Sequence, residues 1–281
     1  MPILSMKHHT LLSAEQIREF REEVYHYYGN HGRELPWRKT NDPYKILISE
    51  VMLQQTQVAR VIEKYEHIIH TFPDIESLAR ARLREILFAW QGLGYNRRAL
   101  YLKKLAEEVT AEFEGRIPAS VDSLMRLPGI GSATANAICA FAFNQPVVFI
   151  ETNIRTVFIH HFFRDRGSVR DTEILPLVAQ TLDPERPRKW YWALMDFGVA
   201  VKKKHANPSK VSVQYQKQAP FKGSNRQIRG MILQVLVRRH RVSESRLIKM
   251  LPFQENVVQH NFEQLEKEGL VVKRGKDISI A

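Results

Sequence analysis

The chain has 281 residues, of which 42 are Lys or Arg and 30 are Asp or Glu, so its formal net charge is +12. This length predicts two domains with a sizeable core, and the charge indicates a polyanionic partner, the alternative being a basic protein that lacks one. The single cysteine, Cys139, excludes internal disulfides and any all-cysteine zinc or iron–sulfur site. Because no apolar run reaches about 18–20 residues and no signal-peptide core is present, we expect a cytoplasmic protein without a membrane partner.

Helical patterns fill most of the first 205 residues. Ser13 followed by Gln16 is a capping-box pattern, which predicts a helix that runs to about Tyr28. Further helical stretches follow at 44–53, 58–69, 75–80, 83–91, 96–113, 119–126, 132–143, 154–163, 172–182 and 187–203. Residues 35–38 read as a short extended or looped piece, and no period-2 strand pattern occurs before residue 145. Short helices with short connections predict a compact all-α body.

The last part of the chain has a different pattern. A polar, basic stretch is typical of a linker, which we place at 206–220. Helices are then expected at 225–240, 243–251 and 254–268, followed by short strands at 270–273 and 278–280. This order predicts a small winged-helix-like domain at 221–281. Its basic residues could contact phosphates or form a solvated face: Arg226, Arg229, Arg238, Arg239 and Lys273.

A glycine-containing turn joins two of the predicted helices at 127–135, with the sequence LPGIGSATA. Pro128 and the two glycines predict a tight turn, because Gly129 and Gly131 tolerate positive φ and leave no Cβ in the way. The N–H groups of this turn and of the following helix start face open space, which makes a ready phosphate site. The alternative is a turn that only joins two helices.

Two glutamates stand where a carboxylate is unusual. Glu50 lies inside the apolar helical run 46–53, where burial would raise its pKa and let it hold a proton near neutral pH. Glu151 lies where an apolar segment becomes a helix start, whose dipole and free N–H groups favour the ionised form. The alternatives are a solvent-facing position for Glu50 and an ordinary helix-terminus charge for Glu151. Carboxylates with pKa values pushed apart suit acid-assisted bond cleavage.

Four sequence blocks resemble a known family. They are LPWR at 35–38, SEVMLQQTQV at 49–58, GLGY at 92–95 and the turn at 127–135. In order and spacing they resemble the MutY family of adenine DNA glycosylases, within the helix-hairpin-helix-GPD superfamily, and the similarity covers residues 14–205. The resemblance implies a two-lobed helical fold, with a six-helix barrel lobe that carries the hairpin at 30–140 and a second lobe made of 1–29 and 141–205.

The resemblance also implies residue roles. Glu50 matches the catalytic glutamate that protonates the purine and activates water, Glu151 the position of the aspartate that stabilises the oxocarbenium-like sugar, and Asn153 an asparagine that assists there. Gln55 matches a residue pushed into the base stack, and Tyr95 a wedge beside the opposing base, although a core aromatic is the alternative at Tyr95. The remaining implied DNA contacts are Gln54, Gly129, Gly131 and Ser132. The implied base pocket comprises Leu35, Trp37, Arg38, Ala133, Trp192 and Met195, where Trp37 could instead be a core aromatic.

Enzymes of this class flip the target nucleotide out of the duplex. Breaking the N-glycosidic bond then needs a protonated leaving base and a shielded cationic sugar, which electrostatic preorganisation supplies. The reaction requires neither a catalytic metal nor a redox cofactor.

The chain departs from the family where the family carries a [4Fe-4S] cluster. The segment 195–198 (MDFG) is present, but the four ligand positions after it are occupied by Lys202, Ser209, Ser212 and Gln218. We therefore expect no cofactor and no cluster, with direct packing and the basic linker holding this lobe together.

Other departures concern the chemistry. Glu151 replaces an aspartate, and the extra methylene moves the charge by ~1.5 Å, so that either the helix start is shifted or the reaction is slower or altered. Ala133 stands where bifunctional relatives have a lysine nucleophile, which predicts a monofunctional enzyme. Trp192 replaces a polar residue that reads the adenine edge in some adenine glycosylases. Residues 221–281 are too short for the family's oxidised-guanine-recognising domain.

Together these observations predict a monomeric, monofunctional DNA glycosylase of base excision repair that acts on double-stranded DNA, with adenine opposite guanine or 8-oxoguanine as the leading substrate. A thymine, uracil or damaged-pyrimidine glycosylase on the same scaffold is the second interpretation. The third is a catalytically inactive lesion- or mismatch-binding protein, which Glu50 argues against and the substituted Glu151 favours.

Overall fold

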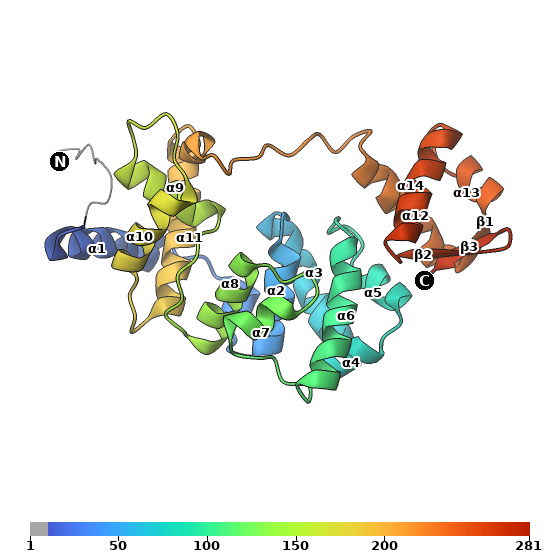
Figure 1. Cartoon of the computed structure of the whole chain (residues 1–281), viewed down its shortest axis with the longest axis horizontal. Coiled ribbons are helices and arrows are strands. Elements are labelled where there is room, and N and C mark those ends of the chain that lie inside the picture. The colour runs from blue at the N-terminus through green and yellow to red at the C-terminus, as the bar shows by residue number, and fades with distance from the viewer. Residues whose placement is uncertain (1–10) are drawn as a thin grey trace. The chain divides into compact units, whose positions relative to one another are not determined.

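The computed structural model describes residues 11–281, so the first ten residues of the predicted second lobe lie outside the described part (Figure 1). The chain divides into two compact units, one made of residues up to 43 with 119–122 and 131–217, the other of 44–118, 123–130 and 218–281. The lobe boundaries drawn from the resemblance stay a prediction. Within the described residues, no helix has both the length and the apolar character that a membrane crossing requires.

The regular elements in the described part of the first unit are helices. Its α-helices are α1 (Ala14–His31), α8 (Ser132–Phe143), α9 (Thr152–Phe162), α10 (Asp171–Thr181) and α11 (Pro187–Lys204). As predicted, Ser13 and Gln16 form a capping box at the start of α1. Residues 36–38, expected to be extended or looped, instead form a turn of 3-10 helix that begins at Pro36. Proline is favoured at this position because its fixed φ suits a helix start, where the N–H group that it lacks would have no intrahelical partner.

Aromatic packing joins α1, α9 and α11 in this unit. The Phe20 ring meets the Phe158 and Trp190 rings edge-on at centroid distances of 5.4 and 5.9 Å. Edge-to-face pairs of this kind add about 0.5–1.5 kcal/mol each beyond their area burial. The helices that carry Glu151 and the MDFG segment are thereby fixed against each other.

The second unit contains α2 (Pro43–Leu53), α3 (Val58–Thr71), α4 (Ile75–Arg80), α5 (Leu83–Ala89), α6 (Arg97–Glu112) and most of α7 (Val121–Arg126). Nearly every residue of α2 from Tyr44 to Met52 is buried, as its apolar composition predicts. The predicted all-α class is confirmed, and the helical periodicity placed these elements within a few residues of their observed ends.

The C-terminal domain, shown in orange to red in Figure 1, belongs to the second unit. It consists of α12 (Asn225–Arg239), β1 (Arg241–Ser243), α13 (Glu244–Lys249), α14 (Glu255–Lys267), β2 (Val271–Arg274) and β3 (Asp277–Ile280). The antiparallel sheet has the order β1-β3-β2, with Val242 opposite Ile278 and Val272 opposite Ser279. This is winged-helix-like topology, and the sequence patterns missed only the three-residue strand β1, which is too short to show a period of two.

Candidate active site

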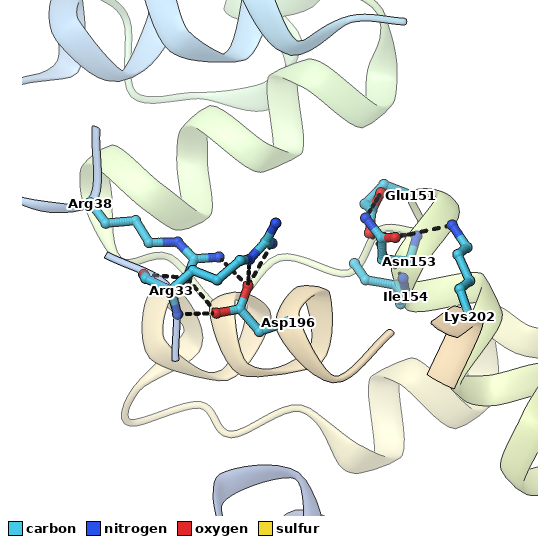
Figure 2. Close-up of polar contacts among 7 residues, drawn as sticks. All are labelled: Arg33, Arg38, Glu151, Asn153, Ile154, Asp196 and Lys202. Atoms are coloured by element: carbon cyan, nitrogen blue, oxygen red, sulfur yellow. Dashed lines mark hydrogen bonds and ion pairs between the residues drawn. The ribbon is translucent and has the colours of Figure 1, made fainter. Parts of the chain in front are cut away.

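Glu151 sits at the N-cap of α9, where the chain turns from extended backbone into the helix. Its Oε1 accepts hydrogen bonds from the backbone N–H groups of Asn153 (2.7 Å) and Ile154 (2.9 Å), and its Oε2 accepts one from the Asn153 side-chain amide (3.2 Å) (Figure 2). A carboxylate at this place satisfies helix N–H groups that have no intrahelical partner. The structure thus brings the two predicted residues Glu151 and Asn153 together.

The charge state of Glu151 reflects opposing effects. Burial raises the pKa of the carboxyl above its ordinary value, whereas the two N–H groups and the charges of Lys202 and Arg155 act in the opposite direction. The N–H groups of the helix start favour the ionised form, as expected, but desolvation is the larger effect. The two N–H groups and the cationic neighbours together favour ionisation against this desolvation.

Lys202 is a neighbour that the sequence patterns did not associate with this site. It lies in the last turn of α11, and its ammonium donates a hydrogen bond of 3.0 Å to Oδ1 of Asn153. Burial lowers the pKa of Lys202, and the Glu151 charge opposes that shift. The other cation, Arg155, donates two hydrogen bonds of 2.7 and 2.6 Å to the Asp171 carboxylate.

A close approach of α9 and α11 makes this contact possible. A Cβ atom built on Gly198 would lie 2.4 Å from the Asn153 carbonyl oxygen and 2.8 Å from its Cβ. Only glycine therefore fits at this position. Because Lys202 lies four residues further along α11, on the same face, its side chain can reach Asn153.

Asp196 of the MDFG segment holds the loop before α2. Its carboxylate accepts hydrogen bonds from the backbone N–H and Nε of Arg33 (both 2.7 Å) and from the Arg38 guanidinium (2.8 and 2.9 Å) (Figure 2). The Asp196 side chain is 1% exposed and that of Arg38 is 6% exposed. Although burial alone would raise it, these bonds and charges hold the pKa of Asp196 below its ordinary value. Arg38, predicted for the base pocket, is thus tied to Asp196.

The other predicted base-pocket residues of this unit occupy different surroundings. Leu35 and Trp37 are buried, Ala133 is exposed in the first turn of α8, and Met195 is half-buried. Trp192 lies under the Arg38 guanidinium, 5.5 Å from its ring centroid. It lines an opening of about 260 Å³ whose other described lining residues are Tyr28, Asn144, Glu185, Arg186, Arg188 and Lys189. The structure brings Arg38 and Trp192 together, whereas Glu151 does not line this opening.

Glu50 lies in the second unit, on α2. It is half-buried, while the residues before and after it in the helix are buried. The adjoining turn carries Gln55 in the left-handed region with φ +53°. Gln54 donates a hydrogen bond of 3.2 Å to the carbonyl of Gly129. The predicted DNA contacts at 54 and 129 are therefore adjacent.

Arg98 holds the turn that carries the predicted DNA contacts. Its buried guanidinium donates to the carbonyls of Val51 and Met52 (both 2.8 Å), Gly94 (3.0 Å) and the hydroxyl of Thr56 (2.8 Å). Burial lowers the pKa of Arg98 to about 10. The side chain thereby ties the C-terminal end of α2 to the Gly-Leu-Gly-Tyr turn.

Tyr95 lies between two guanidinium groups. Its backbone is left-handed, with φ +47°, and its ring lies 5.6 Å from the Arg98 guanidinium carbon and 5.4 Å from that of Arg226. Arg226, at the start of α12, also donates a hydrogen bond of 2.6 Å to the Tyr95 hydroxyl. The residue predicted as a wedge is thus half-buried and in contact with the C-terminal domain.

In the turn between α7 and α8, only one glycine has positive φ. Gly129 has φ +80°, and a Cβ there would lie 2.9 Å from Cβ of Tyr101. Gly131 is the N-cap of α8 with φ −92°, so it does not use the positive φ that glycine tolerates. Gly129, Gly131 and Ser132 are exposed, which leaves the turn accessible to a ligand.

The residues aligned with cluster ligands do not fit an iron–sulfur cluster. The chain offers one thiol, Cys139, which is buried in α8 and has its pKa raised to about 11 by burial. Ser209 is buried and shares a hydrogen bond of 2.6 Å with Thr156 of α9. The segment 211–213 also pairs with Val169 through backbone hydrogen bonds. In the described part of the chain, no group of three or more His, Cys, Asp or Glu is placed to hold a metal ion.

Three of the five basic C-terminal residues considered for phosphate contact have partners within the chain. Arg226 contacts Tyr95, Arg229 donates to Glu268, and Lys273 pairs with Glu244. Arg238 and Arg239 are exposed.

Sequence similarity was found to DNA repair proteins. The pattern of the HhH-GPD superfamily of base excision DNA repair proteins matches residues 48–175. The adenine DNA glycosylase of Mycobacterium tuberculosis is 32% identical over 233 residues, covering 75% of this chain and 76% of that protein. That of Buchnera aphidicola subsp. Baizongia pistaciae is 37% identical over 187 residues, covering 65% of this chain and 52% of its own length. The chain thus spans about half the length of the Buchnera protein.

Solved structures share the fold. A thermostable thymine-DNA glycosylase superposes with a TM-score of 0.60 at 24% identity, over 70% of this chain and 95% of that one. The endonuclease III of a non-covalent DNA complex superposes with a TM-score of 0.57 at 22% identity, over 66% of this chain and 86% of that one. At these identities the likeness concerns the fold alone.

Proposed function

Since the chain belongs to the adenine DNA glycosylase family of the HhH-GPD superfamily, we propose that it is a monofunctional DNA glycosylase of base excision repair. Its substrate is an adenine mispaired with guanine or 8-oxoguanine in double-stranded DNA, and it acts as a monomer in the compartment that holds the DNA. The net charge of +12 suits this polyanionic partner.

The observation that carries the proposal is the arrangement at the start of α9. Glu151 is held by two backbone N–H groups and the Asn153 amide, with Lys202 as a cationic neighbour. A carboxylate fixed in this way suits the stabilisation of the positive charge that develops on the sugar when the glycosidic bond breaks. Glu50 then supplies the proton to the leaving purine and activates the water.

This mechanism uses water as the nucleophile and needs neither a nucleophilic side chain nor a metal ion. Ala133 offers no amine at the exposed start of α8, so a Schiff base with the sugar is not expected at that position. With one buried cysteine in the chain, we propose that the enzyme works without the cluster. Iron analysis of the purified protein is expected to find no stoichiometric iron.

A panel of duplexes tests the function. Each duplex carries one A, T, U or oxidised base opposite G, C or 8-oxoguanine, and alkali-labile sites report excision. We expect cleavage at adenine opposite guanine or 8-oxoguanine. Cleavage at pyrimidines instead would identify the other enzyme class, and tight binding without any cleavage would identify a mismatch-binding protein.

A substitution tests the role of Glu50. Glu50→Gln removes the transferable proton and keeps the size of the side chain, so we expect loss of excision with DNA affinity retained. Glu66→Gln, the same change on an exposed position of α3, serves as the control and is expected to leave excision unchanged. Excision by Glu50→Gln at the wild-type rate would refute the assignment.

A further inference from the structure

Lys202 is connected to Glu151 through one amide group. The ammonium of Lys202 donates to Asn153 Oδ1 at 3.0 Å, and Asn153 Nδ2 donates to Glu151 Oε2 at 3.2 Å (Figure 2). These residues come from the last turn of α11 and the start of α9, within the first unit.

The hydrogen-bonding chemistry of Lys202 fixes the orientation of the amide. An ammonium group only donates hydrogen bonds, so the side of Asn153 that faces it must be the carbonyl oxygen. The –NH₂ group is then turned to Glu151, which as a carboxylate only accepts. Without the ammonium, the amide could rotate and place its oxygen against the carboxylate, where two acceptors would face each other.

Lys202 also differs from the second cation near Glu151. Arg155, on α9 itself, is paired with the Asp171 carboxylate of α10 through two hydrogen bonds, which offset its charge. Lys202, from α11, donates a hydrogen bond to a neutral amide. Its positive charge therefore remains available to favour the ionised form of Glu151.

We propose that Lys202 is a positioning residue for base excision, which orients the Asn153 amide towards Glu151 and places a positive charge beside that carboxylate. The proposal rests on the proposed function, in which the Glu151 carboxylate stabilises the positive charge that develops on the sugar. By the resemblance, Lys202 stands at the position of a cluster cysteine and Glu151 at that of an aspartate. The side chains at these two positions, which both differ from the family pattern, are thus linked by hydrogen bonds through Asn153.

Kinetics of three variants test the proposal. Lys202→Met keeps the length of the side chain without its charge, Lys202→Arg keeps the charge, and Lys203→Met removes an exposed neighbouring charge as the control. For Lys202→Met we expect single-turnover excision to fall about tenfold at neutral pH, and the acidic limb of the pH–rate profile to move up by about one pH unit or more. Lys202→Arg restores most of the rate, and Lys203→Met behaves as wild type.

Affinity for a duplex with a non-cleavable 2′-fluoro-adenine nucleotide shows whether Lys202→Met weakens DNA binding or only the excision step. We expect this affinity to stay within about twofold of wild type in Lys202→Met, because the residue acts on Glu151 and not on the duplex. A wild-type rate and pH profile in Lys202→Met would overturn the proposal. So would a borohydride-trapped DNA adduct that is lost in Lys202→Met, since Lys202 would then be a nucleophile.

A second readout does not depend on activity. In protein labelled with ¹³C at the glutamate carboxyl carbons, the Glu151 resonance reports its titration. We expect its pKa to rise by about one unit or more in Lys202→Met relative to wild type. If the wild type excises no base, the proposed function fails, whereas an unchanged Glu151 titration overturns the positioning role whether or not excision occurs.

Discussion

At the scale of single residues, Asp196 is the charge on which the loop before α2 depends. Its side chain is 1% exposed and accepts hydrogen bonds from both Arg33 and Arg38. Asp196→Asn keeps the volume but leaves two guanidinium groups without a counter-charge. We therefore expect the free energy of unfolding, measured with urea, to fall by about 3–5 kcal/mol.

The matched control for Asp196 is an exposed pair in the same loop. Glu34, whose side chain is 86% exposed, lies 3.3 Å from Lys39, and Glu34→Gln is expected to change the stability by less than about 0.5 kcal/mol. The pKa of Asp196 is held below its ordinary value of 3.8, so its stabilisation is present above pH 3.8 and is lost as the pH falls further, through the lowered pKa. Equal effects of the two substitutions would contradict the role given to burial.

The sequence indicated which residues belong to the candidate site, but not which residues they contact. Glu151 was indicated by the helix start and by the resemblance, and Asn153 by the resemblance alone. The bond from Arg33 to Asp196 joins residues 163 positions apart, and that from Lys202 to Asn153 joins residues 49 apart. No local periodicity relates such pairs, because the fold alone brings them together. The MDFG segment was the only visible signal for Asp196.

At the scale of elements, one glycine sets the distance between α9 and α11. Gly198→Ala would place a Cβ 2.4 Å from the Asn153 carbonyl, so the helices must separate. We expect the unfolding free energy to fall by about 1–3 kcal/mol, as measured by the urea midpoint. Because Asn153 would be displaced, excision is expected to fall as well.

The same substitution on α12 should have the opposite sign. Gly230 is in the interior of α12, and a Cβ there would meet no atom within 4 Å. Gly230→Ala is expected to stabilise the protein by about 0.5–1 kcal/mol, because glycine loses more conformational freedom on folding. A loss of stability in both variants would show that contact with Asn153 is not the reason for glycine at 198.

Helices were predictable at this scale, as were strands β2 and β3, whereas the three-residue strand β1 was not. The helix α3 has apolar residues at helical spacing, with Val61, Tyr65 and Ile68 buried, and its pattern alone locates it. Strand β1 has three residues and exists because β3 offers a pairing edge. Its formation depends on a partner strand 34 to 38 residues away in sequence, which no local pattern records.

At the scale of the whole molecule, the second unit links the C-terminal domain to the turn that carries Tyr95. Helix α12 packs on α5. At the two ends of α12, Arg226 contacts Tyr95, and the Val237 carbonyl accepts a hydrogen bond from Arg84. Arg97 of α6 also lies 3.6 Å from Glu268, which follows α14. The domain is therefore held by polar contacts around the contact between α12 and α5.

The contact between Arg226 and Tyr95 gives a test of this attachment. Arg226→Ala removes a hydrogen bond and a cation–π contact, and Tyr95→Phe removes the hydrogen bond alone. In a double-mutant cycle on the urea unfolding of the full chain, we expect a coupling of about 0.5–1.5 kcal/mol. Arg238→Ala, an exposed position on the same helix, should show no coupling to Tyr95→Phe. Strictly additive effects of Arg226→Ala and Tyr95→Phe would mean that the C-terminal domain is held independently of Tyr95. The domain would then not restrain this proposed wedge residue.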